Sequence, residues 1–442
     1  MERFLTLELI RERSDYMKDY SQTILAMGKE AKEAARFLRT ASSLVKDDFL
    51  SEIANQLEVH KEDILIANEK DVKIARNNGL KEALVERLYL GESRFKEMVD
   101  GLLQVVSLKD PVGEVDSMWL NEAGLKIGSK RVPLGVIAMI YESRPNVTID
   151  AAALCVKTGN AVILKGGSDA LNTNMALMEA VREALKVKEF PLGTVQLVET
   201  TDRDFTSQLL VAKESIDCVI PRGSEGLIKL VAETSRIPVI ETGTGNCHIY
   251  VDRGYNLDNA LDIIVNAKVQ RPGACNAVET LLINEEQKEG LLEILLPKMN
   301  SLGVKLALCE ESMKIAEEKN LLTDNMRAAE ESDWETEYLD LILAVRVVQN
   351  LDEAIGHIDK YSSGHSESIL TDNYNHAQTF LDTIDSAAVY VNASTRFTDG
   401  GEFGFGAEIG ISTQKLHARG PMGLKALTTN KYVVYGNGQY RK

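Results

Sequence analysis

A chain of 442 residues exceeds what one hydrophobic core usually serves, so we expect two or more lobes. Acidic residues outnumber basic ones by 67 to 50, and no Lys/Arg run stands out, which argues against a nucleic-acid partner. The five cysteines include no CxxC pair, and no apolar stretch reaches the roughly 18 residues that a membrane span needs. These features predict a soluble cytoplasmic protein without a membrane anchor, zinc ribbon or disulfide framework.

The N-terminal fifth of the chain is predicted to be helical. Charges interrupt the apolar residues of segment 1–16, so it is a poor signal peptide; we expect a frayed helical extension, or a true start at Met17. From Gln22 to Leu102 apolar residues recur at helical spacing, which predicts amphipathic helices packed on a larger body. Segment 120–141 then predicts two extended stretches around Gly128-Ser129, forming a hairpin that leads into a buried strand.

Strands and helices alternate through the rest of the chain. Strands are predicted at 160–166, 193–199, 216–222 and 237–243, with helices between them. A second alternating series begins near His248 and ends near residue 372. Alternation of this kind predicts an α/β protein with two parallel-sheet lobes covered by helices.

Two Gly-rich turns follow strands of the first lobe. Lys165-Gly166-Gly167-Ser168 is one, and Arg222-Gly223-Ser224-Glu225-Gly226 is the other. Backbone amides at a helix N-terminus bind phosphate, and glycine lets a ligand approach closely. Each turn alone can be a plain connection, and Lys165 can be a solvated lysine, but together they favour a dinucleotide site.

Cys275 is the candidate nucleophile. It follows Pro272 and Gly273 in a predicted turn between a helix and the strand 277–284, whereas Cys155, Cys218 and Cys309 lie in apolar runs typical of core residues. Nearby Arg271 and backbone amides would lower the pKa of its thiol, and a thiolate is a good acyl acceptor. Glu241 ends a predicted strand and is either a general base or a carboxylate that caps a helix or contacts the cofactor. Cys247 and His248 are adjacent on a strand and point to opposite faces, and the six histidines form no metal-binding spacing, so no metal is expected.

From about Tyr20 to the C-terminus the chain resembles the aldehyde dehydrogenase superfamily, and within it the γ-glutamyl phosphate reductase family. The matching blocks are segments 141–167, 270–282, 354–371 and 390–423. The resemblance implies NADPH-dependent reduction of L-glutamyl 5-phosphate to L-glutamate 5-semialdehyde, the second step of proline synthesis from glutamate, with a thioester on Cys275.

The resemblance also assigns roles to residues. Ser143 and Asn146 are candidates for the oxyanion donor, and Lys165, Gly166, Gly167, Ser168, Gly223 and Ser224 for cofactor binding. Gly167 and Ser168 occupy the region where NAD-linked members keep a ribose-binding acid, which favours NADPH. Glu241 matches the water-activating glutamate of the superfamily, which a reductase does not need, and Asp340 matches the glutamate that holds the nicotinamide ribose.

The substrate carries a carboxylate, an ammonium group and an acyl phosphate. Candidate residues for this pocket, each with an ion pair as the alternative, are Arg144, Arg271, Ser394, Thr395, Arg396 and Asp399. The hairpin near 120–132 and the tail after Ala388 resemble a subunit-pairing arm, so we expect a homo-oligomer. The lability of the substrate suggests transient contact with the glutamate 5-kinase that makes it.

The predicted organisation has four parts. They are an N-terminal extension (1–16), an NADPH-binding domain (17–118 and 147–244), a catalytic domain (245–387), and an oligomerisation arm with a substrate-pocket segment (119–146 and 388–442). Two alternatives remain at this point: an oxidising aldehyde dehydrogenase that uses Glu241 to activate water on a small acidic semialdehyde, and a non-catalytic binding protein on the same fold.

Overall fold

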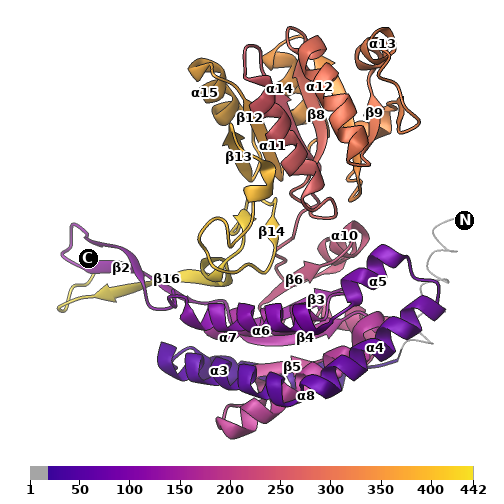
Figure 1. The fold of residues 1–442 in the computed structure, drawn as a ribbon. Coiled ribbons are helices and arrows are strands. Elements are labelled where there is room, and N and C mark those ends of the chain that lie inside the picture. The colour runs from indigo at the N-terminus through magenta and orange to yellow at the C-terminus, as the bar shows by residue number, and fades with distance from the viewer. Residues whose placement is uncertain (1–17, 442) are drawn as a thin grey trace, which may run out of the picture. The chain divides into compact units, whose positions relative to one another are not determined.

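The computed structural model describes residues 18–441, so the predicted N-terminal extension lies outside the described part. The chain forms two compact units (Figure 1). Unit 1 comprises residues up to Glu241 together with Gly406–Ile409 and the stretch from Met422 onward. Unit 2 comprises Thr242–Phe405 and Gly410–Pro421. Each unit has its own parallel sheet, which confirms the predicted α/β class with two sheet-containing lobes.

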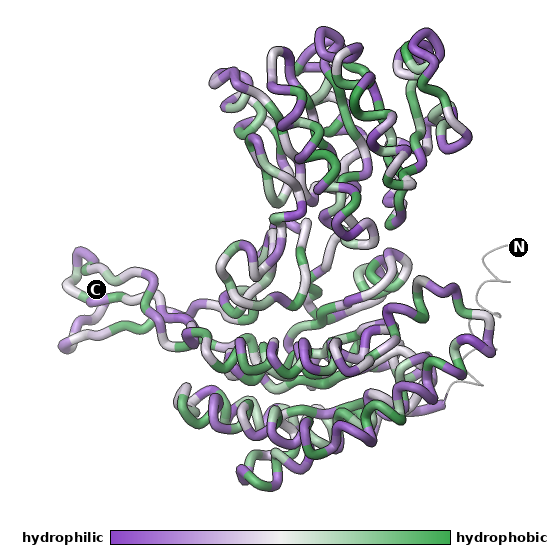
Figure 2. Tube along the Cα trace, viewed as in Figure 1, coloured by the Kyte–Doolittle hydropathy of each residue, from purple (hydrophilic) through white to green (hydrophobic). Residues whose placement is uncertain are grey.

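Amphipathic helices begin unit 1, as the apolar spacing predicts. They are α2 (Ser21–Leu38), α3 (Ser43–Val59), α4 (Lys61–Asn77), α5 (Glu82–Leu88) and α6 (Glu92–Ser107). Along these helices hydrophobic and hydrophilic stretches alternate (Figure 2), and most of the buried residues are apolar. The helices therefore form a layer with one face in the core.

The sheet of unit 1 is entirely parallel. Its strand order is β5-β4-β3-β6, with β3 (Val136–Tyr141) fully buried between β4 (Ala161–Gly166) and β6 (Cys218–Arg222). The remaining elements are α7 (Asn146–Lys157), α8 (Leu171–Val187), β5 (Val195–Leu197), α9 (Arg203–Leu209) and α10 (Glu225–Thr234). The predicted strand at 237–243 is wrong: only an isolated bridge between Val239 and Val219 forms there.

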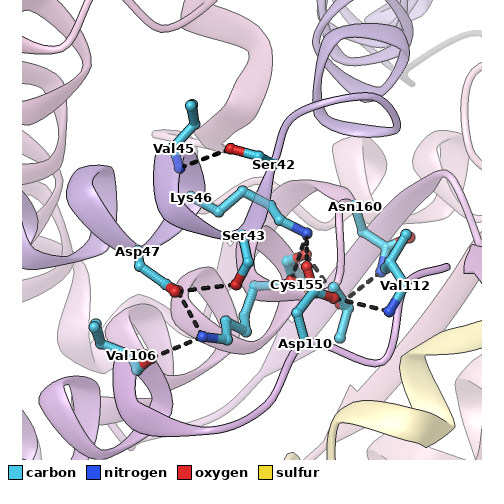
Figure 3. A network of polar contacts seen from close by, with 12 residues as sticks. Ser42, Ser43, Val45, Lys46, Asp47, Val106, Asp110, Val112, Cys155 and Asn160 are labelled. Atoms are coloured by element: carbon cyan, nitrogen blue, oxygen red, sulfur yellow. Dashed lines mark hydrogen bonds and ion pairs between the residues drawn. The ribbon is translucent and has the colours of Figure 1, made fainter. Parts of the chain in front are cut away.

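Two buried lysines tie the helical layer to α7 (Figure 3). Lys46 of α3 pairs with Asp110 and donates to the carbonyl oxygen of Lys157 at 2.9 Å. Lys157, the last residue of α7, pairs with Asp47 at 2.5 Å and donates to Val106 O at 2.7 Å. Each buried ammonium thus meets a carboxylate and a carbonyl, which is what burial of a charge requires.

Three antiparallel strands of unit 1 form what we call the arm. They are β1 (Val115–Leu120), β2 (Lys126–Pro133) and β16 (Thr428–Tyr435). The hairpin prediction is confirmed, but its turn was misplaced: the chain reverses at Asn121–Gly124, where Gly124 has a φ of +76°, and Gly128-Ser129 lies inside β2. Exposed apolar side chains of the arm include Trp119, Leu120 and Tyr432.

Unit 2 contains a seven-stranded parallel sheet of order β10-β9-β11-β8-β7-β12-β13. Its central strands are β8 (Val278–Asn284), β7 (Cys247–Val251), β11 (Ile342–Val348) and β12 (Ser366–Leu370); the outer ones are β9 (Lys305–Leu308), β10 (Met326–Ala328) and β13 (Ala388–Val391). Helices α11 (Leu257–Val269), α12 (Lys288–Ser301) and α13 (Glu310–Glu318) pack on one face through Ile249, Leu281 and their neighbours. Helices α14 (Leu351–Tyr361) and α15 (Tyr374–Thr383) pack on the other through Tyr250 and Leu282, as the alternation of side chains along a strand requires.

Candidate active site

Unit 1 has a candidate ligand site of its own, at the carboxyl edge of its parallel sheet. Because β3 lies between β4 and β6, the segments that follow these three strands meet at one edge. Strand order also reverses there, since β4 and β5 extend from one side of β3 and β6 from the other. Such a switch point is where open α/β sheets bind ligands. The strand order β4-β3-β6 places the two Gly-rich turns on either side of segment 142–146.

Lys165 is a buried cation at this edge. Its side chain ends β4, the residue is only 7% exposed, and its Nζ donates to the carbonyl oxygen of Gly166 at 3.0 Å. Burial lowers the pKa of this ammonium group. Within residues 18–441 it forms no ion pair, so the site holds positive charge that a carboxylate does not neutralise.

The second Gly-rich turn contains an acidic residue that the sequence reasoning missed. The Glu142 carboxylate accepts a hydrogen bond from the Ser224 amide at 2.7 Å, at the start of α10. A side chain at position 223 would place its Cβ 2.5 Å from the same carboxylate oxygen, so Gly223 is needed for this contact. The sequence feature that could have revealed Glu142 is an acidic residue directly after the apolar residues of β3. In this structure Glu142 therefore sits at the amides expected to meet a cofactor phosphate.

Both candidate oxyanion donors are held by carboxylates within unit 1. Ser143, whose φ of +36° is unusual for a non-glycine residue, donates from Oγ to Asp169 at 3.2 Å. Asn146 donates from Nδ2 to Asp150 at 2.8 Å. Asp169 was also missed, although it directly follows Ser168.

Unit 2 has its own candidate site at the loop 270–277, here called the nucleophile loop. It connects α11 to β8, and two tight turns form within it, with Ala274 N bonded to Arg271 O and Ala277 N to Ala274 O. Cys275 is half-buried on this loop. The residue is thus in the turn that the sequence predicted, and not in the core.

The backbone around Cys275 is fixed from several directions. Its carbonyl oxygen accepts a hydrogen bond from the Cys247 thiol at 3.2 Å. The next residue, Asn276, donates to the carbonyl oxygen of Thr398 at 2.9 Å and accepts at its own carbonyl from Thr395 Oγ1 at 2.7 Å. The thiol of Cys247 stays protonated because burial raises its pKa well above the usual range, so it serves as a donor.

Gly245 packs directly against the nucleophile. A Cβ at this position would lie 1.5 Å from Cys275 O and 2.7 Å from its Cα, so no side chain fits. The Gly245 amide donates to Glu337 Oε1 at 2.7 Å. The backbone of Gly245 is therefore clamped between the nucleophile loop and Glu337.

Arg396 lies against both ends of the nucleophile loop. Its Nε donates to Gln270 Oε1 at 3.0 Å, and its Nη1 contacts Asn276 Oδ1. Burial and the neighbouring Arg271 lower the pKa of this guanidinium, whereas the charges of Asp399 and Cys275 raise it. In the described part of the chain, Arg396 and the exposed Arg271 form no ion pair with a carboxylate. Two cations thus lie beside the candidate nucleophile, and neither forms an ion pair with a carboxylate of the described residues.

The other predicted substrate residues have mainly local contacts. Ser394 Oγ accepts from the Arg396 amide at 3.3 Å, Thr395 bonds to Asn276 as above, and Asp399 Oδ1 accepts from the Gly401 amide at 2.8 Å. They shape the segment that presents Arg396. Arg144 is half-buried in unit 1, between Ser143 and α7.

Glu241 and Asp340 lie outside regular structure. Glu241 is half-buried and is the last residue of the main stretch of unit 1. Asp340 is exposed just before β11, and its Oδ1 accepts from the Leu341 amide at 2.7 Å. Glu337, three residues earlier, is the carboxylate that accepts from the Gly245 amide, and it was not among the residues predicted from the sequence.

The remaining cysteines largely follow the core prediction. Cys155 and Cys218 are buried, but Cys309 is only half-buried, with its sulfur accepting from the Val347 amide at 3.3 Å. His248 faces Glu367 whereas Cys247 faces Cys275 and His365, which confirms that Cys247 and His248 point apart. Across the described residues no group of three or more His, Cys, Asp or Glu side chains has the arrangement of a metal site, and no helix is long and apolar enough to cross a membrane.

Comparison with known proteins identifies the family of the chain. A sequence profile described as the aldehyde dehydrogenase family matches residues 15–315. The γ-glutamyl phosphate reductase of Caldanaerobacter subterraneus subsp. tengcongensis is 56% identical over 414 residues, covering 94% of this chain and 98% of the relative. That of Clostridium tetani is 51% identical and covers 96% and 100%.

Solved structures give the same result. The crystal structure of γ-glutamyl phosphate reductase from Thermotoga maritima has a TM-score of 0.91 at 50% identity, covering 95% of this chain and 100% of that one. An acetylating aldehyde dehydrogenase from Geobacillus thermoglucosidasius shares the fold, with a TM-score of 0.67 at 18% identity. The chain therefore belongs to the aldehyde dehydrogenase family, and within it to the γ-glutamyl phosphate reductases.

Proposed function

We propose that this protein reduces L-glutamyl 5-phosphate to L-glutamate 5-semialdehyde and phosphate, with NADPH as the reductant. The observation that carries the proposal is the position of Cys275, half-buried in a turn, with Arg271 and Arg396 beside it and outside any ion pair of the described residues. An anionic acyl donor suits this setting better than a neutral aldehyde. The names of the relatives at 50–56% identity point to the same reaction.

Cys275 acts as the nucleophile in this proposal. Its sulfur attacks the acyl carbon, the S–C bond forms as the C–O bond to phosphate breaks, and phosphate leaves with the electron pair. Bound NADPH supplies the hydride that reduces the resulting thioester. The reduced adduct then collapses, its C–S bond breaks, and the electron pair returns to the sulfur of Cys275 as the aldehyde departs.

Arg271 and Arg396 balance the negative charge of the substrate. Arginine presents several donors in one plane and remains charged, so it pairs well with phosphate or carboxylate. Arg396 is held rigidly by Gln270 and Asn276, which suits substrate orientation, whereas the exposed Arg271 suits the leaving phosphate. Ser394, Thr395 and Asp399 position this segment, and Arg144 is a further candidate for the α-carboxylate.

The cofactor would be held at the carboxyl edge of the unit 1 sheet. The fit rests on Lys165, a buried ammonium without a carboxylate, beside the Gly166-Gly167 and Gly223-Ser224 turns. Ser168 leaves room for a 2′-phosphate, and the nearest acid, Asp169, accepts a hydrogen bond from Ser143. NADPH is thus the proposed reductant, and Asp340 is the residue proposed to bind its nicotinamide ribose.

The oxyanion formed at the acyl carbon needs fixed donors. We assign this role to the Cys275 amide together with Asn146 or Ser143, whose donors are now bonded to Asp150 and Asp169. Glu241 is not required as a base, because hydrolysis of the thioester would return glutamate and waste the phosphorylation.

The arm supports a homo-oligomer, since its three strands expose Trp119, Leu120 and Tyr432 to solvent in a single chain. Light scattering after size exclusion would show at least a dimer, and a monomer would refute this assignment. Transient contact with glutamate 5-kinase remains part of the proposal; mixing the two proteins and finding no complex and no kinetic benefit would refute it.

The reverse reaction tests the function. Purified protein is incubated with glutamate 5-semialdehyde and NADP, and NADPH formation is followed with and without inorganic phosphate. Formation should require both phosphate and Cys275, since phosphate must resolve the thioester. Cys275→Ala should be inactive, whereas Cys309→Ala, a half-buried thiol outside the site, should retain activity. Formation without phosphate would instead indicate an oxidising aldehyde dehydrogenase, and no formation would favour a binding protein.

A further inference from the structure

An ion pair lies buried directly behind the nucleophile loop. Lys268 is the second-to-last residue of α11, and Glu279 is the second residue of β8, so they flank the loop at its two ends. Lys268 Nζ lies 2.5 Å from Glu279 Oε2, and both side chains are 0% exposed. The pair therefore ties the end of the helix to the start of the strand across the loop that carries Cys275.

The second oxygen of Glu279 holds another chain segment. Oε1 accepts a hydrogen bond from the Leu339 amide at 3.2 Å. Leu339 has a φ of +54°, a left-handed conformation that a branched residue adopts only when its surroundings hold it. Glu279 is thus one carboxylate that joins three segments: α11, β8 and the stretch 337–341.

Segment 337–341 contacts the nucleophile from its other side. The Tyr338 ring lies 6.0 Å from Lys268 Nζ, and Glu337 accepts from the Gly245 amide. Gly245 in turn packs against the backbone of Cys275, as described above. The chain of contacts Lys268, Glu279, 337–339 and Gly245 therefore closes around the nucleophile loop.

The pair is a poor device for stability alone. Burial raises the pKa of Glu279, to about 8, and lowers the pKa of Lys268, because each charge loses its hydration. Replacing such a buried pair by apolar residues of similar size is often neutral or stabilising, whereas removing one partner is strongly destabilising. A function other than stability is therefore the better account of its position.

We propose that Lys268 and Glu279 are positioning residues that hold the nucleophile loop and segment 337–341 in fixed register for the reaction of Cys275. This inference rests on the proposed function. The pair touches neither substrate nor cofactor, and it acts through the two segments that it joins. Its loss should lower kcat much more than it changes KM.

The experiment compares single and paired substitutions. Lys268→Met and Glu279→Leu each leave a buried partner unpaired, and each should lower the Tm. The double variant Lys268→Met/Glu279→Leu removes both charges and should recover a Tm close to that of the wild type. A matched control is Lys319→Met/Glu293→Leu, the same exchange at a surface pair whose charged atoms lie 2.6 Å apart in unit 2.

Two readouts are taken on the double variant. In the phosphate-dependent reverse assay, kcat should fall at least tenfold while KM stays within about threefold. The rate of Cys275 alkylation by iodoacetamide at fixed pH should fall at least threefold, and the control should match the wild type in both. A refolded double variant with wild-type kcat and an alkylation rate at or above that of the wild type would overturn the inference. The alkylation rate keeps the test separate from the proposed function, since it needs no turnover.

Discussion

Gly245→Ala is the substitution for which the structure gives the sharpest prediction. The new Cβ would lie 1.5 Å from Cys275 O, and real contacts of this kind are at least 3.0 Å, so one backbone must move by about 1.5 Å. Gly245 is held by Glu337, and we expect the nucleophile loop to give way. A displacement of ~1 Å at a reacting group costs roughly 100-fold in rate, and overpacking costs about 1–3 kcal/mol of stability.

The assay is the phosphate-dependent formation of NADPH, with kcat and Tm measured in parallel. Gly273→Ala is the matched control: it lies in the same loop, and its Cβ would meet only Leu339 O, at an ordinary 3.7 Å. We expect kcat to fall about 100-fold for Gly245→Ala and less than threefold for Gly273→Ala. Activity of Gly245→Ala within threefold of the wild type would refute the view that this contact positions Cys275.

Three further predictions concern the cofactor site and the pH dependence of stability. Lys165→Met should weaken NADPH binding about tenfold in a fluorescence titration. It should leave Tm unchanged or raise it, because burying the Lys165 ammonium group costs free energy. Lys229→Met, at an exposed lysine, is the control, and an unchanged affinity of Lys165→Met would show that Lys165 does not bind the cofactor. Glu142→Gln keeps an acceptor for the Ser224 amide but removes a negative charge. NADPH should therefore bind about two to five times more tightly to this variant at low salt. Weaker binding would contradict this prediction. Burial lowers the pKa of His357 to about 2. Below about pH 6.5 the unfolded chain therefore takes up a proton at this residue that the folded chain does not. The free energy of unfolding thus falls as pH falls, by about 2 kcal/mol at pH 5. Urea titrations at pH 7 and pH 5 should show a smaller difference for His357→Gln than for the wild type, and an equal difference would contradict this account.

Much of the fold is encoded in local patterns. Alternating apolar strands and amphipathic helices were enough to predict two parallel-sheet lobes, because burial on both faces leaves near-continuous apolar runs such as Val136–Tyr141. Local patterns failed where tertiary contacts decide. The apolar stretch 237–243 pairs only at Val239, and Gly128-Ser129 continues a strand since the turn is made four residues earlier.

The candidate site, like the fold, could be predicted only in part from the sequence. Sequence alone determined that Cys275 lies in a turn and that Gly-rich turns follow two strands, since Pro, Gly and apolar runs report on the local backbone. It did not reveal Glu142 at the start of α10, Gly245 against Cys275, or Glu279 between Lys268 and Leu339. Each of these contacts joins residues that are distant in sequence, and their partners are set by strand order and register. Only the tertiary structure could decide them, because hydrogen bonds and close backbone contacts depend on positions in space that residue type and spacing do not specify.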